Sequence, residues 1–149
     1  MQWFFALTED STAFREYAEM LKVAVHTARK HTSLVPHLIY DGRENDFTAW
    51  LRRHGVQIVP HRSRFRDALG ELGREKGNLH FDAALAGAFS RVELPEIVAR
   101  LGDAERVLST DFDVLFTAEV VPELVANPCE YFPCAPASRR DDYVKINTG

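Results

Sequence analysis

Residues 3–40 read WFFALTEDSTAFREYAEMLKVAVHTARKHTSLVPHLIY, and the fold class follows from this stretch. The apolar and aromatic run from Trp3 to Leu7 is typical of a buried strand. Apolar residues then recur at helical spacing from Phe14 to Ala28, which predicts an amphipathic helix. A second apolar run from Val35 to Tyr40 predicts another strand, which ends at the Asp41-Gly42 turn. A strand, a helix and a strand in this order favour parallel pairing through a right-handed crossover.

The rest of the chain continues this alternation. The further elements that we expect are a helix capped by Asp46 and ended by Gly55, a strand at 56–59, a polar helix within 61–78, helices at 81–89 and 95–101, and a strand opening at 106–109. The pattern predicts a single α/β domain over residues 1–149, with a mostly parallel sheet flanked by helices. Such sheets bind ligands at the carboxyl ends of their strands.

The composition is that of an ordinary globular domain. The chain has 149 residues, 46% of them hydrophobic, and 18 Lys and Arg against 22 Asp and Glu give a net charge of −4. A negative balance argues against nucleic acid as the main partner, because nucleic-acid binding depends on Lys and Arg. No apolar run approaches the ~18 residues of a membrane span, so we expect a cytoplasmic protein without one.

Residues 106–116, RVLSTDFDVLF, carry the strongest chemical signal. If they extend as a strand, Asp111 and Asp113 project to one side and Phe112 packs on the other. Two converging carboxylates repel each other unless a cation neutralises them, and hard oxygen ligands favour Mg²⁺ or Mn²⁺. The alternative is a strand end that carries two solvated acids.

A second acidic segment, Thr8-Glu9-Asp10, also follows an expected strand. Two polar loops at one edge of a parallel sheet are typical of a nucleotide site. Neither the G-x-G-x-x-G fingerprint nor the Walker loop occurs in the sequence, so a pyrophosphate here would need a metal and an arginine instead.

Arginines dominate residues 47–66, a segment without any acid; they are Arg52, Arg53, Arg62, Arg64 and Arg66. They form either a solvated surface or a patch for an anionic partner.

Four segments resemble the GT-A glycosyltransferases, in particular the family-8-like group that includes bacterial lipopolysaccharide galactosyl- and glucosyltransferases and glycogenin. These segments are FALTED at 5–10, FSRVELPE at 89–96, VLSTDFDVL at 107–115 and INTG at 146–149, and they occur in the family's order. The resemblance implies a GT-A, Rossmann-like fold. It also implies that the chain is the N-terminal, donor-binding part of a longer fold, whose later segments supply a further metal ligand and much of the acceptor site.

The resemblance further implies a retaining hexosyltransferase that uses a nucleotide sugar, usually a UDP-sugar. Mn²⁺, or Mg²⁺, would bridge the donor diphosphate to Asp111 and Asp113. The donor-binding residues would be Ala6, Leu7, Thr8, Glu9, Asp10, Arg91, Thr110 and Phe112, while Asn147 would approach the donor sugar or the acceptor. The acceptor could be a glycan, a lipid-linked group or a protein. The family usually has Asp in place of Thr8 and Tyr near Ser11, so the base preference stays open.

Two other functions are compatible with the sequence. Asp111 and Asp113 also resemble the D-x-D nucleophile motif of haloacid-dehalogenase-type phosphohydrolases, in which the first Asp attacks phosphorus. That motif normally opens its fold, whereas here it lies late in the chain. A non-catalytic nucleotide-binding domain is the other alternative.

Overall fold

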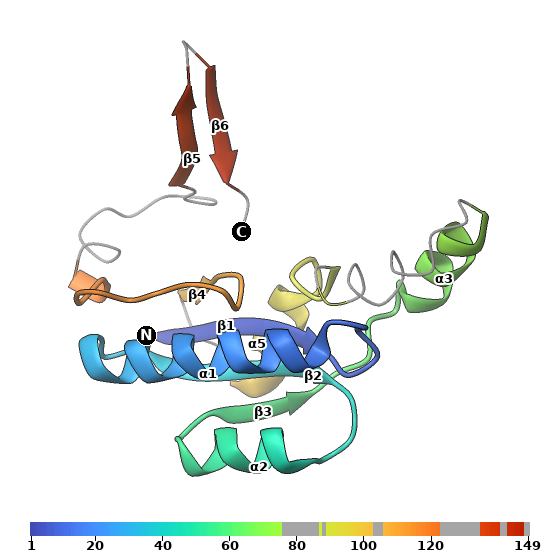
Figure 1. Cartoon of the computed structure of the whole chain (residues 1–149), viewed down its shortest axis with the longest axis horizontal. Coiled ribbons are helices and arrows are strands. Elements are labelled where there is room, and N and C mark those ends of the chain that lie inside the picture. Colours follow the sequence, from blue (N-terminus) through green and yellow to red (C-terminus); the bar gives the residue numbers. More distant parts are fainter. Residues whose placement is uncertain (76–86, 88, 103–105, 123–134, 141–142, 148–149) are drawn as a thin grey trace.

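A computed structural model of the chain describes residues 1–75, 87, 89–102, 106–122, 135–140 and 143–147, the last two segments by their backbone alone. An all-parallel sheet contains the strands β1 (Gln2–Thr8), β2 (Val35–Asp41), β3 (Gln57–Pro60) and β4 (Val107–Ser109). The helices are α1 (Phe14–His31), α2 (Asp46–Arg53), α3 (Arg66–Glu75) and α5 (Leu94–Leu101). A separate antiparallel hairpin is formed by β5 (Ala135–Arg140) and β6 (Tyr143–Asn147) (Figure 1). The predicted α/β class with a parallel sheet is confirmed.

The strand order β3–β2–β1–β4 places β1 between two neighbours that lie far apart in the sequence. Along β2 the pairing covers the whole of β1, from Gln2↔Val35 to Thr8↔Asp41. On the other side β4 pairs only with its first residues, from Gln2↔Val107 to Phe4↔Ser109. The chain therefore adds β2 and β3 on one side of β1 and then places β4 on the other side. This reversal of strand order creates a topological switch point between β1 and β4. Open α/β sheets bind ligands at this position, beyond the carboxyl ends of the strands.

Helices cover both faces of the sheet. Alternate residues of β1 point to opposite faces, so they pack into two different cores. Trp3, Phe5 and Leu7 belong to the core that includes the buried residues of α1 and α2. Phe4 packs instead in the core with the buried residues of α5. Figure 1 shows α5 behind the sheet and α1 in front of it. Two-sided burial explains why the β1 sequence is almost continuously apolar.

Local signals set the ends of α2. Asn45, in extended conformation, is the N-cap, and its side chain accepts a hydrogen bond from the backbone N–H of Thr48 while the Thr48 hydroxyl accepts from the Asn45 N–H. The expectation that Asp46 caps the helix was wrong by one residue. Gly55 has a φ of 77°, and the N–H groups of Gly55 and Val56 donate to carbonyls of the last helical turn. The predicted stop at Gly55 is thus a Schellman ending.

The remaining elements differ from the sequence expectation mainly in their bounds. β3 lies one residue later than expected, α3 occupies part of the expected 61–78 segment, and α5 carries Pro95 in its first turn as predicted. The helix expected at 81–89 lies outside the described residues, apart from Gly87 and Phe89. Among the described helices, none has both the length and the apolar character needed to cross a membrane.

Candidate functional site

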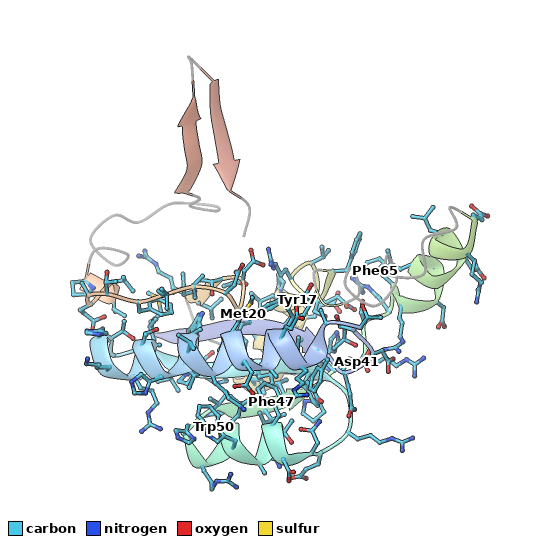
Figure 2. All side chains as sticks on the ribbon, viewed as in Figure 1. Tyr17, Met20, Asp41, Phe47, Trp50 and Phe65 are labelled. Atoms are coloured by element: carbon cyan, nitrogen blue, oxygen red, sulfur yellow. The ribbon has the colours of Figure 1, made fainter. Side chains whose placement is uncertain are left out.

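An open cleft of about 160 Å³ lies at the carboxyl end of β1, beside the segment that follows β4. Its walls come from three parts of the chain that are distant in sequence: β1 with the start of α1, the residues before α5, and the segment that follows β4. The lining residues are Ala6, Leu7, Thr8, Ser11, Tyr17, Gly87, Arg91, Thr110, Asp111 and Phe112. Tyr17, which lines the cleft from α1, is labelled in Figure 2. The cleft thus occupies the switch point that the strand order defines.

The segment that carries the two aspartates leaves the sheet earlier than expected. β4 ends at Ser109, and the Thr110 N–H makes a last bond to the Phe4 carbonyl, 3.1 Å away. Asp111 and Asp113 therefore lie in a loop and not on a strand, so the strand alternation from which their convergence was inferred does not apply to them. Beyond this point the chain turns toward α1, where the ring of Phe112 packs on Tyr17 with 4.7 Å between centroids.

Arg91 and Asp111 form an ion pair between Nη2 and Oδ1 at the cleft. Arg91 lies in the turn before α5, so this pair joins the segments that precede α5 and follow β4. Burial lowers the pKa of Arg91 below its usual value, while the negative charge of Asp113 acts in the opposite direction. The guanidinium stays charged in a partly desolvated position, where its interaction with an anion is stronger than in water.

Asp113 is exposed and is not among the residues that line the cleft. Its charge nevertheless acts on Arg91, so both carboxylates lie within the electrostatic reach of the same guanidinium. Across the part of the chain that the structure describes, no group of three or more His, Cys, Asp or Glu residues could hold a metal ion. A pair of carboxylates fits Mg²⁺ or Mn²⁺, since these cations commonly take only one or two protein carboxylates and complete their shell with water and substrate phosphates.

The expected donor-binding segment at residues 6–10 divides into two parts. Ala6, Leu7 and Thr8 line the cleft. Thr8 is only 2% exposed, and its Oγ1 has no hydrogen-bond partner among the described residues. Glu9 instead accepts hydrogen bonds from the Arg43 N–H at 2.7 Å and from Asn45 Nδ2 at 3.3 Å. These contacts hold the Glu9 carboxylate at the loop between β2 and α2.

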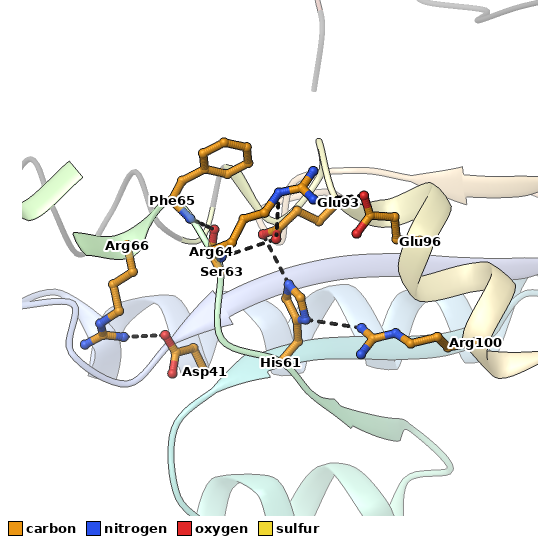
Figure 3. Close-up of polar contacts among 9 residues, drawn as sticks. All are labelled: Asp41, His61, Ser63, Arg64, Phe65, Arg66, Glu93, Glu96 and Arg100. Carbon is orange, nitrogen blue, oxygen red and sulfur yellow. Dashed lines mark hydrogen bonds and ion pairs between the residues drawn. The ribbon is translucent and has the colours of Figure 1, made fainter. Parts of the chain in front are cut away.

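Asp10, the other acid of that segment, pairs with Arg66, which also pairs with Asp41 at the end of β2. Figure 3 shows the contact between Arg66 and Asp41. Burial raises the pKa of the Asp41 carboxyl, while the charges of Arg62 and His61 lower it. Arg66 therefore links the ends of β1 and β2 to the start of α3, and Asp10 is engaged in this link outside the cleft.

A buried carboxylate, Glu93, organises a second polar cluster beside the end of β3 (Figure 3). Burial alone would raise the pKa of Glu93, but hydrogen bonds from Ser63, His61 and the Arg64 N–H hold it below its usual value. His61 Nε2 lies 3.2 Å from Oε2 of Glu93, and Arg100 Nη2 lies 3.3 Å from His61 Nδ1. These contacts join the loop after β3 to the start of α5, through Glu93, and to its last turn, through Arg100.

Arginines of the segment 47–66 form ion pairs with acidic residues outside that segment. Arg52 pairs with Glu44, and Arg64 pairs with Glu93 and with Glu96. Since these arginines are paired, the local charge excess seen in the sequence is largely offset on the folded surface.

Sequence reasoning did not include Ser11, Tyr17 and Gly87 among the site residues, although they line the cleft. Tyr17 counted as part of the apolar stripe of α1, and its hydroxyl, a polar group within that stripe, is the signal that could have singled it out. Asn147 lies in β6, where its backbone pairs with Ala135, and its side chain lies outside the description.

No family model, curated protein or solved structure matches this chain. The candidate site is therefore defined by the geometry of its own residues.

Proposed function

We propose that this chain is the donor-binding part of a metal-dependent, retaining glycosyltransferase of the GT-A type. It would take a sugar from a nucleoside-diphosphate sugar, with a UDP-sugar favoured, and transfer it to a glycan, lipid-linked or protein acceptor. The observation that carries the proposal is the ion pair of Arg91 with Asp111 in a cleft at the switch point of a parallel sheet.

The charges of the cleft suit a diphosphate with its cation. Asp111 and Asp113 would hold Mn²⁺ or Mg²⁺ through carboxylate oxygens, the ligands that these cations prefer. When bound, the cation neutralises charge on the departing nucleoside diphosphate. Arg91 would bind a phosphate oxygen, and its partial burial strengthens that interaction.

The apolar wall of the cleft suits the nucleoside. Ala6 and Leu7 line it from β1. The rings of Tyr17, from α1, and Phe112, from the segment after β4, contact each other and also line it. Thr8 contributes a buried hydroxyl without a partner among the described residues, which a ribose or base group could satisfy. The mixture of a few polar groups with an apolar wall is typical of a small-molecule site.

A non-catalytic nucleotide-binding domain is the second candidate. It is favoured by the position of Asp113, which is exposed and lies outside the cleft lining. A domain of this kind would bind a nucleotide through Arg91 and Thr8 without any requirement for metal.

The test is incubation of the protein with UDP-, GDP- and CDP-sugars in Mn²⁺, with the release of nucleoside diphosphate as the readout. The proposal predicts release from one donor, its loss in chelator and its loss in Asp111→Asn. Glu71→Gln, which removes an exposed acid of α3, is the matched control and should retain the activity.

Two other outcomes would contradict the proposal. Tight nucleotide binding that is indifferent to chelator, without release from any donor, would identify the binding domain. Hydrolysis of a generic phosphate ester in Mg²⁺, abolished by Asp111→Asn, would identify a phosphohydrolase instead.

A further inference from the structure

The indole of Trp3 is fully buried, yet its N–H reaches the loop that carries the aspartates. Nε1 donates to Thr110 Oγ1 at 2.8 Å, and this hydroxyl in turn donates to the backbone carbonyl of Asp111 at 2.7 Å. A continuous hydrogen-bonded path therefore runs from the middle of the core to the backbone of Asp111. Because Trp3 is 0% exposed, it cannot touch a ligand in the cleft itself.

Trp3 also contacts the far end of the same loop. The ring of Phe116 packs edge-on against the Trp3 ring, with 4.9 Å between centroids, and the Phe116 N–H donates to Thr27 Oγ1 at 3.3 Å. Thr110 and Phe116 bracket Asp111 and Asp113, so one buried side chain holds both ends of the segment that bears the two carboxylates.

A phenyl ring at this position could fill the core but could not bond to the loop. Phe5, its neighbour in the same core, fills its space with a ring that has no polar atom. A buried indole N–H needs an acceptor, and at this position the acceptor is the hydroxyl beside Asp111. The N–H of Trp3 thus bonds to the loop, whereas the ring packs in the core.

We propose that Trp3 is a positioning residue, which orients the Asp111–Asp113 loop for the metal–diphosphate ligand through Thr110. This inference rests on the proposed function. Hydrogen bonds that orient a metal ligand from outside the coordination sphere can be needed for metal binding, and their loss typically weakens metal affinity about 10–100-fold.

The experiment is a double-mutant cycle with Trp3→Phe and Thr110→Val, both of which remove the hydrogen bond and keep most of the side-chain volume. Affinities for UDP, GDP and CDP in Mn²⁺ are measured by calorimetry, and folding is checked by circular dichroism and urea denaturation. Each single variant should weaken the Mn²⁺-dependent binding about tenfold. The double variant should lose no more than Thr110→Val alone, because Trp3→Phe breaks a path that Thr110→Val has already broken.

Phe5→Leu is the matched control for core damage, since the ring of Phe5 packs against Trp3 with 4.4 Å between centroids and has no polar atom that could bond to the loop. It should lower the midpoint of urea denaturation and leave the Mn²⁺-dependent affinity within about twofold.

The outcomes separate the two levels of the account. If the unaltered chain binds none of the nucleotides in Mn²⁺, the proposed function fails and this inference falls with it. If the unaltered chain binds but folded Trp3→Phe binds equally well, or if the losses in the two single variants simply add, the positioning role is contradicted while the proposed function stands.

Discussion

Arg91 and Asp111 form an ion pair near the carboxyl ends of β1 and β4, the two strands between which the strand order reverses. The pair neutralises a carboxylate that would otherwise repel its neighbour Asp113, whose charge also acts on Arg91. In the proposed function the same guanidinium binds a phosphate of the donor. Arg91 would therefore exchange the Asp111 carboxylate for that phosphate when the ligand binds.

Replacing Arg91 with Gln should therefore have opposite effects on the two ligands. Nucleoside diphosphate affinity in Mn²⁺ should fall about tenfold or more, because a charge-assisted hydrogen bond to phosphate is lost. Affinity for Mn²⁺ alone should rise, since no cation competes for Asp111. Calorimetry gives the first quantity and the electron paramagnetic resonance signal of free Mn²⁺ gives the second.

Arg53→Gln, which removes an exposed arginine of α2, is the control and should change neither affinity. Unchanged nucleotide affinity in Arg91→Gln would show that Arg91 does not serve the phosphate.

Glu93 should stabilise the fold in a pH-dependent way. Its pKa in the folded protein lies below the usual value of 4.5, so its contribution is present above that value and is lost as the pH falls through the folded pKa. Glu93→Gln should lower the free energy of unfolding by about 2 kcal/mol at neutral pH, because buried donors lose a charged acceptor. Urea denaturation should show this difference shrinking as the carboxylate of the unaltered chain becomes protonated.

Glu96→Gln, in the first turn of the helix that Glu93 precedes, offers a control. Glu96 pairs with Arg64 at 3.0 Å, but its side chain is 63% exposed, so its loss should cost less than about 1 kcal/mol at any pH. An equal loss in the two variants would argue against a special role for the buried carboxylate.

Gly42 lies where the chain passes close to two side chains. A Cβ at this position would come within 2.6 Å of the Tyr40 ring and 2.7 Å of the Glu9 Cβ. Gly42→Ala should therefore lower the free energy of unfolding by about 2 kcal/mol, because the buried Tyr40 ring has little freedom to move. Thermal denaturation measures the change, and Gly87→Ala, where a Cβ meets no atom of the described residues within 4 Å, should cost less than about 0.5 kcal/mol.

The sequence predicted the sheet and the helices on its faces because their signals are local. Apolar runs and helical periodicity identified β1, α1 and β2, and Gly55 identified the end of α2. The cap of α2 was less certain from sequence, since Asn45 and Asp46 can both serve and only the extended backbone of Asn45 decides between them.

The candidate site was harder to predict because its details depend on contacts distant in sequence. Whether Asp111 and Asp113 share a strand depends on where β4 stops pairing with β1, and that pairing ends at Phe4. Glu9 and Asp10 looked equivalent to Thr8 as site residues, but partners from other loops hold them outside the cleft. A sequence motif can thus identify a carboxylate as a candidate ligand, whereas only the fold shows whether that carboxylate is already paired with another residue.

The most direct test of the central claim is calorimetric titration with UDP, GDP and CDP, each in Mn²⁺ and in chelator, of the unaltered chain and of Asp113→Asn. The account predicts saturable binding of one nucleotide that disappears in chelator and weakens about tenfold or more in the variant. Glu71→Gln should bind as the unaltered chain does. Binding that survives both chelator and Asp113→Asn, or no binding to any of the three nucleotides, would contradict a metal-dependent donor site in this cleft.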